Sequence, residues 1–238
     1  MRLFCFPYAG GSPFTFRNWQ ASLPDCVEVC PVQLPGHARR LKEMPYTHLK
    51  PLVEAIADAF SPVLDKPFTF FGHSMGGLIS FELARYLRRE GGPQPVHLFV
   101  SGLRAPQLPD SDPPFHDMPE PEFLKELRRL RGTPDELFDH PEMIQIITPV
   151  LRADFSVCQT YVYTPEPPLD CPITAFGGVT DPETSDGRLL AWQEQTTSSF
   201  TMQMFPGDHF FVNTERAQVL WVLYLELVWV ARAVSIFR

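Results

Sequence analysis

The segment from residue 68 to residue 89 constrains the fold more than any other part of the sequence. A short apolar run over 68–71 ends in the turn Gly-His-Ser-Met-Gly over 72–76, and a helical pattern continues over 75–89. In such a strand–turn–helix unit the central serine is held in a sharp, strained turn, so that its hydroxyl projects above the sheet. Glycines two positions before and after it let the two backbones approach closely. The pattern therefore predicts a reactive hydroxyl at Ser74.

The rest of the chain alternates between short apolar runs and helical patterns, which is typical of a mostly parallel sheet flanked by helices. The expected strands span 2–6, 27–32, 68–71, 97–101, 173–176 and 201–205. The expected helices span 49–63, 75–89, 120–131, 142–160, 189–195 and 214–234. Most of the expected strands end in a turn, and ligands of open α/β sheets bind beyond the carboxyl ends of the strands. We expect one domain over 1–238 with the α/β-hydrolase fold.

Residues 105–168 interrupt this alternation. The start of the segment is crowded with prolines, namely Pro106, Pro109, Pro113, Pro114, Pro119 and Pro121. Helical patterns follow, and the order of strand and turn resumes only near residue 173. A segment of roughly sixty residues is far longer than an ordinary connection. We expect it to be a helical lid inserted above the sheet; a single long crossover connection is the alternative.

Composition indicates a globular protein and argues against a nucleic-acid-binding or membrane-spanning one. The 238 residues are 44% hydrophobic and 20% charged, as in globular chains, and the net charge is −8. An acidic chain without a Lys/Arg cluster is expected to bind neither nucleic acid nor an anionic membrane. The longest apolar run, 219–231, contains Glu226 and is shorter than the roughly 20 residues that span a bilayer. The five cysteines include no C-x-x-C pair, and Pro7 comes too early for a signal peptide. We therefore expect free thiols and a cytoplasmic location.

A serine hydroxyl needs a general base, and His209 is the best candidate among the seven histidines. In the α/β-hydrolase fold the partners follow in the order serine, acid, histidine. His209 is the last histidine, and it lies in a loop after the final expected strand. His73 is adjacent to Ser74, but neighbouring side chains at such a turn point apart, so we expect His73 to have a packing role.

The acid that orients the base is expected at Asp181, just past the strand over 173–176. The alternatives nearby are Glu183, Asp186 and Asp208. Asp208 directly precedes the histidine, which is an awkward position for a hydrogen bond to that ring. The turn after the strand over 97–101 holds no acid. The order and position together favour Asp181.

The oxyanion formed during acyl transfer needs two N–H donors that are already in place. We expect one from the backbone of Met75, the residue after the nucleophile. The other is expected from the turn after the first strand, with Ala9 as first choice and Tyr8 as second. The Gly-Gly pair in that turn could also suggest phosphate binding, but it lacks the G-x-x-x-x-G-K-[S/T] spacing of a phosphate loop.

Taken together, these motifs resemble the type II thioesterases that accompany modular polyketide and nonribosomal peptide synthases. The resemblance rests on the segments 6–12 (Phe-Pro-Tyr-Ala-Gly-Gly-Ser), 33–37 (Gln-Leu-Pro-Gly-His), 71–77, 177–181, 191–192 and 207–211. It implies an α/β-hydrolase core with a helical lid and places the family's triad on Ser74, Asp181 and His209. It also implies hydrolysis of stalled or aberrant acyl groups from the phosphopantetheine arms of acyl or peptidyl carrier proteins, without a metal or redox cofactor.

Two other functions use the same features. A general carboxylesterase or lipase would have the same three residues, although the first turn lacks the HGGG type of oxyanion loop. A non-catalytic receptor on a hydrolase scaffold would not need a complete triad.

Overall fold

A six-stranded sheet forms the centre of the computed structural model, which describes residues 1–110, 112–133, 135–184 and 187–236. Its strand order is β2-β1-β3-β4-β5-β6, and every neighbouring pair is parallel. The strands are β1 (Arg2–Phe6), β2 (Glu28–Pro31), β3 (Phe68–His73), β4 (His97–Ser101), β5 (Ile173–Gly178) and β6 (Phe200–Phe205). The prediction of a mostly parallel sheet flanked by helices is confirmed.

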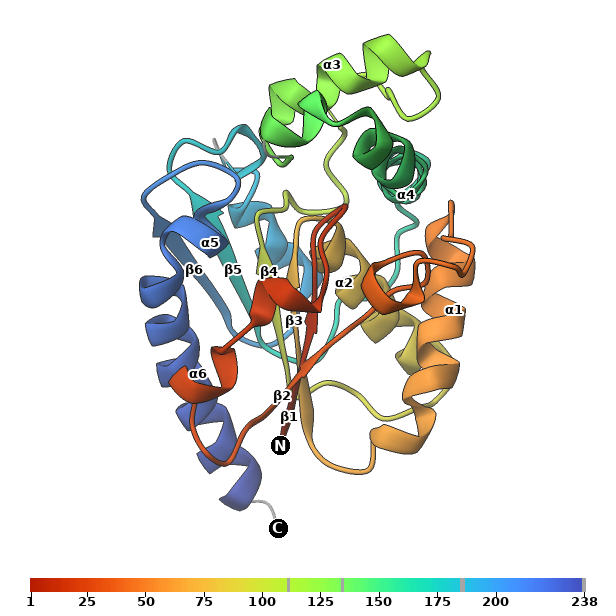
Figure 1. Ribbon diagram of the computed structural model, residues 1–238. Helices are drawn as coiled ribbons and strands as arrows, with labels where there is room; N and C mark the ends of the chain where they lie inside the picture. The colour runs from red at the N-terminus through yellow and green to blue at the C-terminus, as the bar shows by residue number, and fades with distance from the viewer. Residues whose placement is uncertain (111, 134, 185–186, 237–238) are drawn as a thin grey trace.

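Helices cover both faces of this sheet (Figure 1). The α-helices are α1 (Leu49–Phe60), α2 (Met75–Arg89), α3 (Glu120–Leu130), α4 (Pro141–Gln159), α5 (Phe211–Thr214) and α6 (Arg216–Ile236). Short 3₁₀ helices join them: η1 (Pro13–Phe16), η2 (Trp19–Ser22), η3 (Ala38–Arg40), η4 (Ser61–Val63), η5 (Asp135–Asp139), η6 (Pro182–Thr184) and η7 (Leu190–Gln195).

The central strands β1, β3, β4 and β5 are mostly apolar because both of their faces are buried, whereas the edge strands β2 and β6 have exposed positions. Phe4 and Phe6 of β1 pack in the core on the side of α1 and α2, whereas Leu3 and Cys5 pack in the core on the side of α6. Successive side chains of a strand point to opposite faces, so a central strand needs apolar residues at every position. This burial explains why the strand positions could be predicted closely from sequence.

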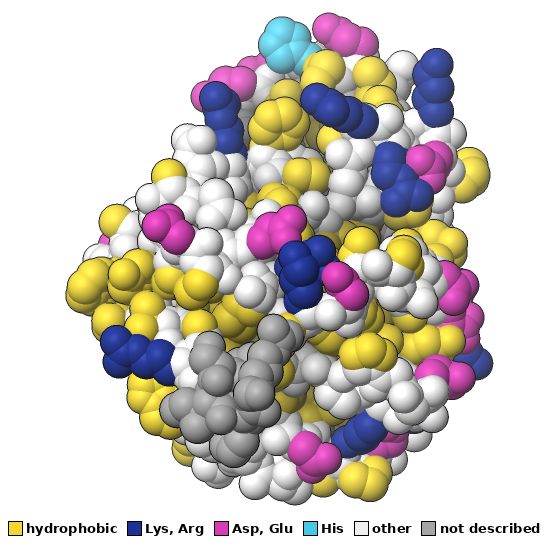
Figure 2. Space-filling view, turned by 90° about the horizontal axis from the view of Figure 1, so that it is seen from below, with side chains coloured by type: hydrophobic (Ala, Val, Ile, Leu, Met, Phe, Trp, Pro, Cys, Tyr) yellow, Lys and Arg dark blue, Asp and Glu magenta, His cyan; other side chains and the backbone are white. Residues whose placement is uncertain are grey.

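Helix α6 is buried on one side only, although its apolar run over 219–231 would suit a fully buried helix. One side, including Leu223 and Leu227, is buried against the sheet, whereas the side chains of Trp221 and Trp229 are 62% and 74% exposed. No helix in the described ranges has the length and hydropathy needed to cross a bilayer. On the face drawn in Figure 2, acidic and basic side chains are interspersed and form no continuous basic surface.

Two smaller differences concern helix type. The segment expected as a helix over 189–195 is the 3₁₀ helix η7, a form with tighter turns that is used in short pieces. The helix expected over 214–234 is divided into α5 and α6, with Glu215 between them.

Helices α3 and α4 lie together above the carboxyl ends of the strands (Figure 1). Part of the segment 105–168 forms a small apolar cluster of its own, with Phe115, Phe123, Leu127 and Leu151 at its centre. This cluster is distinct from the two cores that flank the sheet. The helical layer therefore covers the edge of the sheet at which the site residues predicted from sequence lie.

Candidate active site

Ser74 occupies a strained turn between β3 and α2. Its backbone has φ 53° and ψ −119°, a conformation that is rare for residues other than glycine and that costs free energy. A Cβ atom on Gly72 would overlap the carbonyl oxygen of Gly76, and a Cβ atom on Gly76 would overlap that of Phe6. Glycine is therefore required at both positions, as the sequence pattern predicts. Ser74 itself is half-buried, which leaves part of it accessible.

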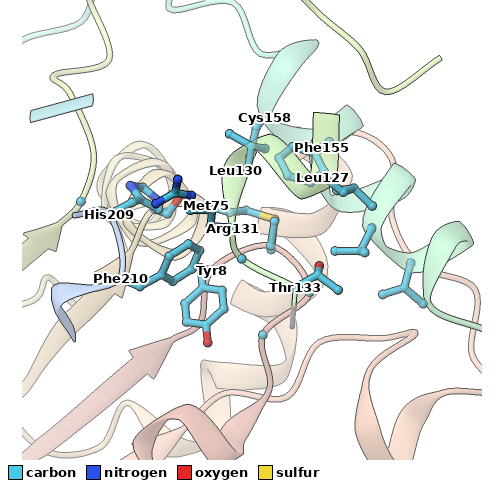
Figure 3. Close-up of a pocket in the computed structure, with 18 of the residues that line it drawn as sticks. Tyr8, Met75, Leu127, Leu130, Arg131, Thr133, Phe155, Cys158, His209 and Phe210 are labelled. Carbon is cyan, nitrogen blue, oxygen red and sulfur yellow. The ribbon is translucent and has the colours of Figure 1, made fainter. Parts of the chain in front are cut away.

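A cavity of about 820 Å³ lies between the strand ends and the helices above them, and Ser74 is in its wall. Figure 3 shows Met75 and His209 in the wall together with Leu127 and Phe155, which come from α3 and α4. Such a cavity, largely apolar and with a few convergent polar groups, is typical of a small-molecule or acyl-chain site.

His209 and Asp181 also line this cavity, and they are joined by a hydrogen bond. Nδ1 of His209 donates to Oδ2 of Asp181 at 2.9 Å. The carboxylate is 1% exposed, and its other oxygen accepts the N–H of Glu183 at 3.0 Å. A buried acceptor on Nδ1 fixes the ring tautomer and leaves Nε2 free to accept a proton. The structure thus gathers the serine, the acid and the histidine from the ends of β3, β5 and β6.

The alternative acids have other partners. Glu183 forms an ion pair with Arg104, with 2.6 Å between Oε2 and Nη1. Asp208 is exposed, and its Oδ1 accepts the N–H of Phe210 at 2.9 Å. Asp186 lies outside the described residues. Of the acids described near this loop, Asp181 is the one that binds the His209 ring.

His73 is fully buried behind the turn. Its Nδ1 lies 2.8 Å from Oγ of Ser101, and its Nε2 lies 2.9 Å from the carbonyl oxygen of His209. Burial, together with the nearby His209, lowers the pKa of His73 well below its ordinary value, so the ring stays neutral. His73 thus supports the loop that carries His209, which agrees with the packing role expected from sequence.

The two predicted oxyanion donors border the same cavity. Met75 is the first residue of α2, where N–H groups have no acceptor within the helix. Ala9 lies in the turn after β1, which is closed by a hydrogen bond of 2.8 Å from Gly11 N to the carbonyl oxygen of Tyr8. The Tyr8 ring packs edge-on against Phe210, with 5.3 Å between ring centroids. Both backbone segments are therefore held beside Ser74.

A buried acid–base pair at this site was not predicted from sequence. Nε2 of His37 and Oδ2 of Asp154 are 2.8 Å apart, and both side chains are about 5% exposed or less. Burial alone would lower the pKa of His37, but the hydrogen bond and the charge of Asp154 outweigh it and raise the pKa. His37 belongs to the Pro-Gly-His segment noted above, whereas Asp154 is on α4, more than a hundred residues away.

Other reactive groups are less suited to chemistry here. All five cysteines are free, and Cys158 borders the cavity. Burial raises the pKa of the Cys158 thiol, which keeps it protonated and weakly nucleophilic. Among the residues that the structure describes, no group of His, Cys, Asp or Glu side chains has the makeup of a metal site.

Comparison with known proteins agrees with this geometry. The family model described as Thioesterase domain matches residues 1–223. The gramicidin S biosynthesis protein GrsT of Aneurinibacillus migulanus is 48% identical over 220 residues, which cover 92% of this chain and 86% of GrsT. RedJ, a thioesterase from the prodiginine biosynthetic pathway in Streptomyces coelicolor, is 44% identical with a TM-score of 0.89, covering 95% of this chain and 90% of RedJ.

The type II thioesterase BorB from the borrelidin biosynthetic cluster is 31% identical with a TM-score of 0.82, covering 93% of this chain and 88% of BorB. These similarities confirm both the α/β-hydrolase fold and the resemblance to type II thioesterases. Since the family match extends over nearly the whole chain, the protein belongs to the thioesterase domain family and is a thioester hydrolase.

Proposed function

We propose that this enzyme is a serine thioesterase that removes stalled or aberrant acyl groups from the phosphopantetheine arms of acyl or peptidyl carrier proteins. Ser74 is the nucleophile, His209 the general base and Asp181 the acid that orients the base. The single observation that carries this proposal is the His209–Asp181 hydrogen bond beside the strained Ser74 turn in one cavity. The relatives from gramicidin S, prodiginine and borrelidin biosynthesis support the carrier-bound substrate.

The first half of the reaction forms an acyl-enzyme. Nε2 of His209 takes the Ser74 proton while Oγ attacks the thioester carbonyl carbon. The N–H groups of Met75 and Ala9 stabilise the charge that develops on the carbonyl oxygen. The tetrahedral intermediate collapses, the carbon–sulfur bond breaks, and the pantetheine sulfur leaves as a thiol with the proton from His209.

The second half releases the acid. His209 removes a proton from water, and the hydroxide attacks the acyl carbonyl carbon in the same oxyanion site. The bond to Oγ then breaks, and His209 returns the proton to Ser74. No step requires a further reactant.

The segment 105–168 would act as a lid inserted into the single α/β domain. Its own apolar cluster is separate from the cores beside the sheet. The loop after α3 rests on the catalytic loop, since a Cβ atom on Gly132 would come within 2.7 Å of Cζ of Phe210. A layer that touches the site but has a separate small core can open without unfolding the sheet.

We expect amide hydrogen exchange to be about tenfold or more faster in α3 and η5 than in β3 and β4, because opening of the lid exposes few apolar contacts. Exchange measured by mass spectrometry on the free enzyme checks this. Equal protection of the lid and the central strands would show that the segment is a fixed part of the core.

The carrier-bound substrate makes a second prediction. For one acyl group, we expect kcat/KM to be at least about tenfold higher on a carrier protein than on a simple ester, because the carrier adds binding contacts outside the cavity. Acyl-CoA should fall between the two. The net charge of −8 gives no long-range attraction to an acidic carrier, so these contacts must be local.

Arg39 is a candidate for such a local contact with the carrier protein. Arg39 is exposed, whereas Arg40 is already bound to Glu43. Arg39→Ala should lower kcat/KM on the carrier substrate and leave the simple ester unchanged. If the wild-type enzyme shows no preference for the carrier over the simple ester, the general esterase function is the better description.

A further inference from the structure

Asp154 links three parts of the chain beside the active-site cavity, which its partners Gly10 and His37 line. It lies on α4, in the helical layer above the sheet, and it is 3% exposed. Its Oδ2 accepts the N–H of Gly10 at 2.7 Å. The same oxygen lies 2.8 Å from Nε2 of His37. One carboxylate oxygen therefore joins the helical layer to the turn after β1 and to the loop after β2.

The partners of His37 fix its protonation. Nδ1 lies 2.9 Å from the carbonyl oxygen of Pro35, which can only accept a hydrogen bond. Nε2 faces Asp154, whose oxygen already accepts the N–H of Gly10. Both ring nitrogens thus face acceptor oxygens, an arrangement that favours the protonated His37 ring, whose pKa is raised by Asp154 against the effect of burial. A buried charge pair of this kind holds its elements in place, because removing one partner leaves the other charge uncompensated.

The turn that Asp154 holds is the one that carries Ala9. Gly10 has φ +74°, and a Cβ atom there would come within 2.5 Å of Cδ2 of Leu151, which is also on α4. The next amide, that of Gly11, is held by the carbonyl oxygen of Tyr8. The two peptide groups that follow Ala9 are thus fixed, one by α4 and one within the turn.

We propose that Asp154, paired with His37, is a positioning residue that sets the oxyanion hole by tying α4 to the Ala9–Gly10 turn. When α4 docks on the sheet, the oxyanion hole forms in the same step. The inference rests on the proposed function, because it takes the Ala9 amide as an oxyanion donor. It adds a residue from the lid to the machinery of the reaction.

The test compares Asp154→Ala with the wild-type enzyme on one thioester substrate. We expect kcat to fall by about 10- to 100-fold while KM changes less than about threefold, because the hole binds the transition state and not the ground state. The affinity for an alkyl boronic acid, which forms a tetrahedral adduct with the serine, should fall by the same factor as kcat. Asp154→Asn, which keeps an oxygen for the Gly10 amide, should recover part of both losses.

Ser156→Ala is the matched control. Ser156 is also buried on α4, but its hydroxyl donates to the carbonyl oxygen of Thr47 at 2.9 Å, away from the turn. This variant loses a contact between the same helix and the loop before α1, so its thermal stability should fall while kcat and boronate affinity stay near wild type. If Asp154 acted only through stability, Asp154→Ala would also lower the thermal stability and keep kcat and boronate affinity near wild type.

The proposal is overturned if folded Asp154→Ala keeps kcat within threefold, or if its kcat falls without a matching loss of boronate affinity. If Asp154→Ala does not fold, Asp154→Asn decides by the same two measurements. Failure of the proposed function would look different, because Ser74→Ala would then retain turnover and boronate binding.

Discussion

Replacing Ser74 with alanine is expected to lower kcat by about 10⁵-fold or more, a larger effect than loss of the acid that orients the base. Without the hydroxyl there is no nucleophile, and the base and the acid cannot act alone, since triad members work as a unit. Residual hydrolysis would come from water held near the oxyanion donors. The measurement is thiol release from an acyl-loaded carrier protein or acyl-CoA under single-turnover conditions, together with loss of labelling by a serine-directed covalent probe.

Ser80→Ala is the control for this variant. Ser80 is a fully buried serine on the same helix, and its hydroxyl donates to the carbonyl oxygen of Gly77 at 2.9 Å. Its removal costs one internal hydrogen bond, about 1 kcal/mol of stability, and should leave kcat within a few fold of wild type. Hydrolysis by Ser74→Ala within tenfold of wild type would refute Ser74 as the nucleophile.

The fold could be predicted closely because its strongest signals are local. Strands such as β3 are buried on both faces, so they are continuous apolar runs bounded by turns. Gly72 and Gly76 are dictated by contacts within a few residues of the turn or to the adjacent strand. The helix expected over 189–195 is present as a 3₁₀ helix, and its type could not be predicted, because the choice between a 3₁₀ and an α-helix in six residues depends on packing.

The grouping of Ser74, Asp181 and His209 could also be predicted, because it follows from topology. The carboxyl ends of parallel strands lie at one edge of the sheet, so residues just after β3, β5 and β6 must gather there. The order serine, acid, histidine along the chain then selects Asp181 and His209 from the other acids and histidines.

The role of Asp154 could not be predicted in this way. Its partners, Gly10 and His37, are 144 and 117 residues away, and they meet it only because α4 folds back over the sheet. The available signal was weak: a charged residue beside Ala153 and near Val157, on the apolar side of a helix. Such a residue is rarely buried without a partner, but the sequence does not identify that partner.

Asp181→Asn is expected to lower kcat by about 10³- to 10⁴-fold while the enzyme stays folded. The asparagine amide can donate to Nδ1 of His209, which would favour the tautomer with hydrogen on Nε2. That nitrogen could then no longer accept the Ser74 proton, and the imidazolium would lose its buried counter-charge. Folding should persist, because the asparagine oxygen can still accept the N–H of Glu183, which lies 3.0 Å from Oδ1 of Asp181 in the wild-type enzyme.

The informative comparison is with Asp208→Asn, one residue before the histidine. Asp208 is exposed, and an asparagine there keeps an oxygen for the N–H of Phe210. Its kcat should therefore stay within a few fold of wild type, with circular dichroism and thermal melting confirming that both variants fold. A large loss in Asp208→Asn combined with near-normal turnover in Asp181→Asn would move the acid to Asp208. Because the two positions carry the same chemical change, the contrast between them isolates the hydrogen bond to Nδ1 of His209 from the loss of a charge near the site.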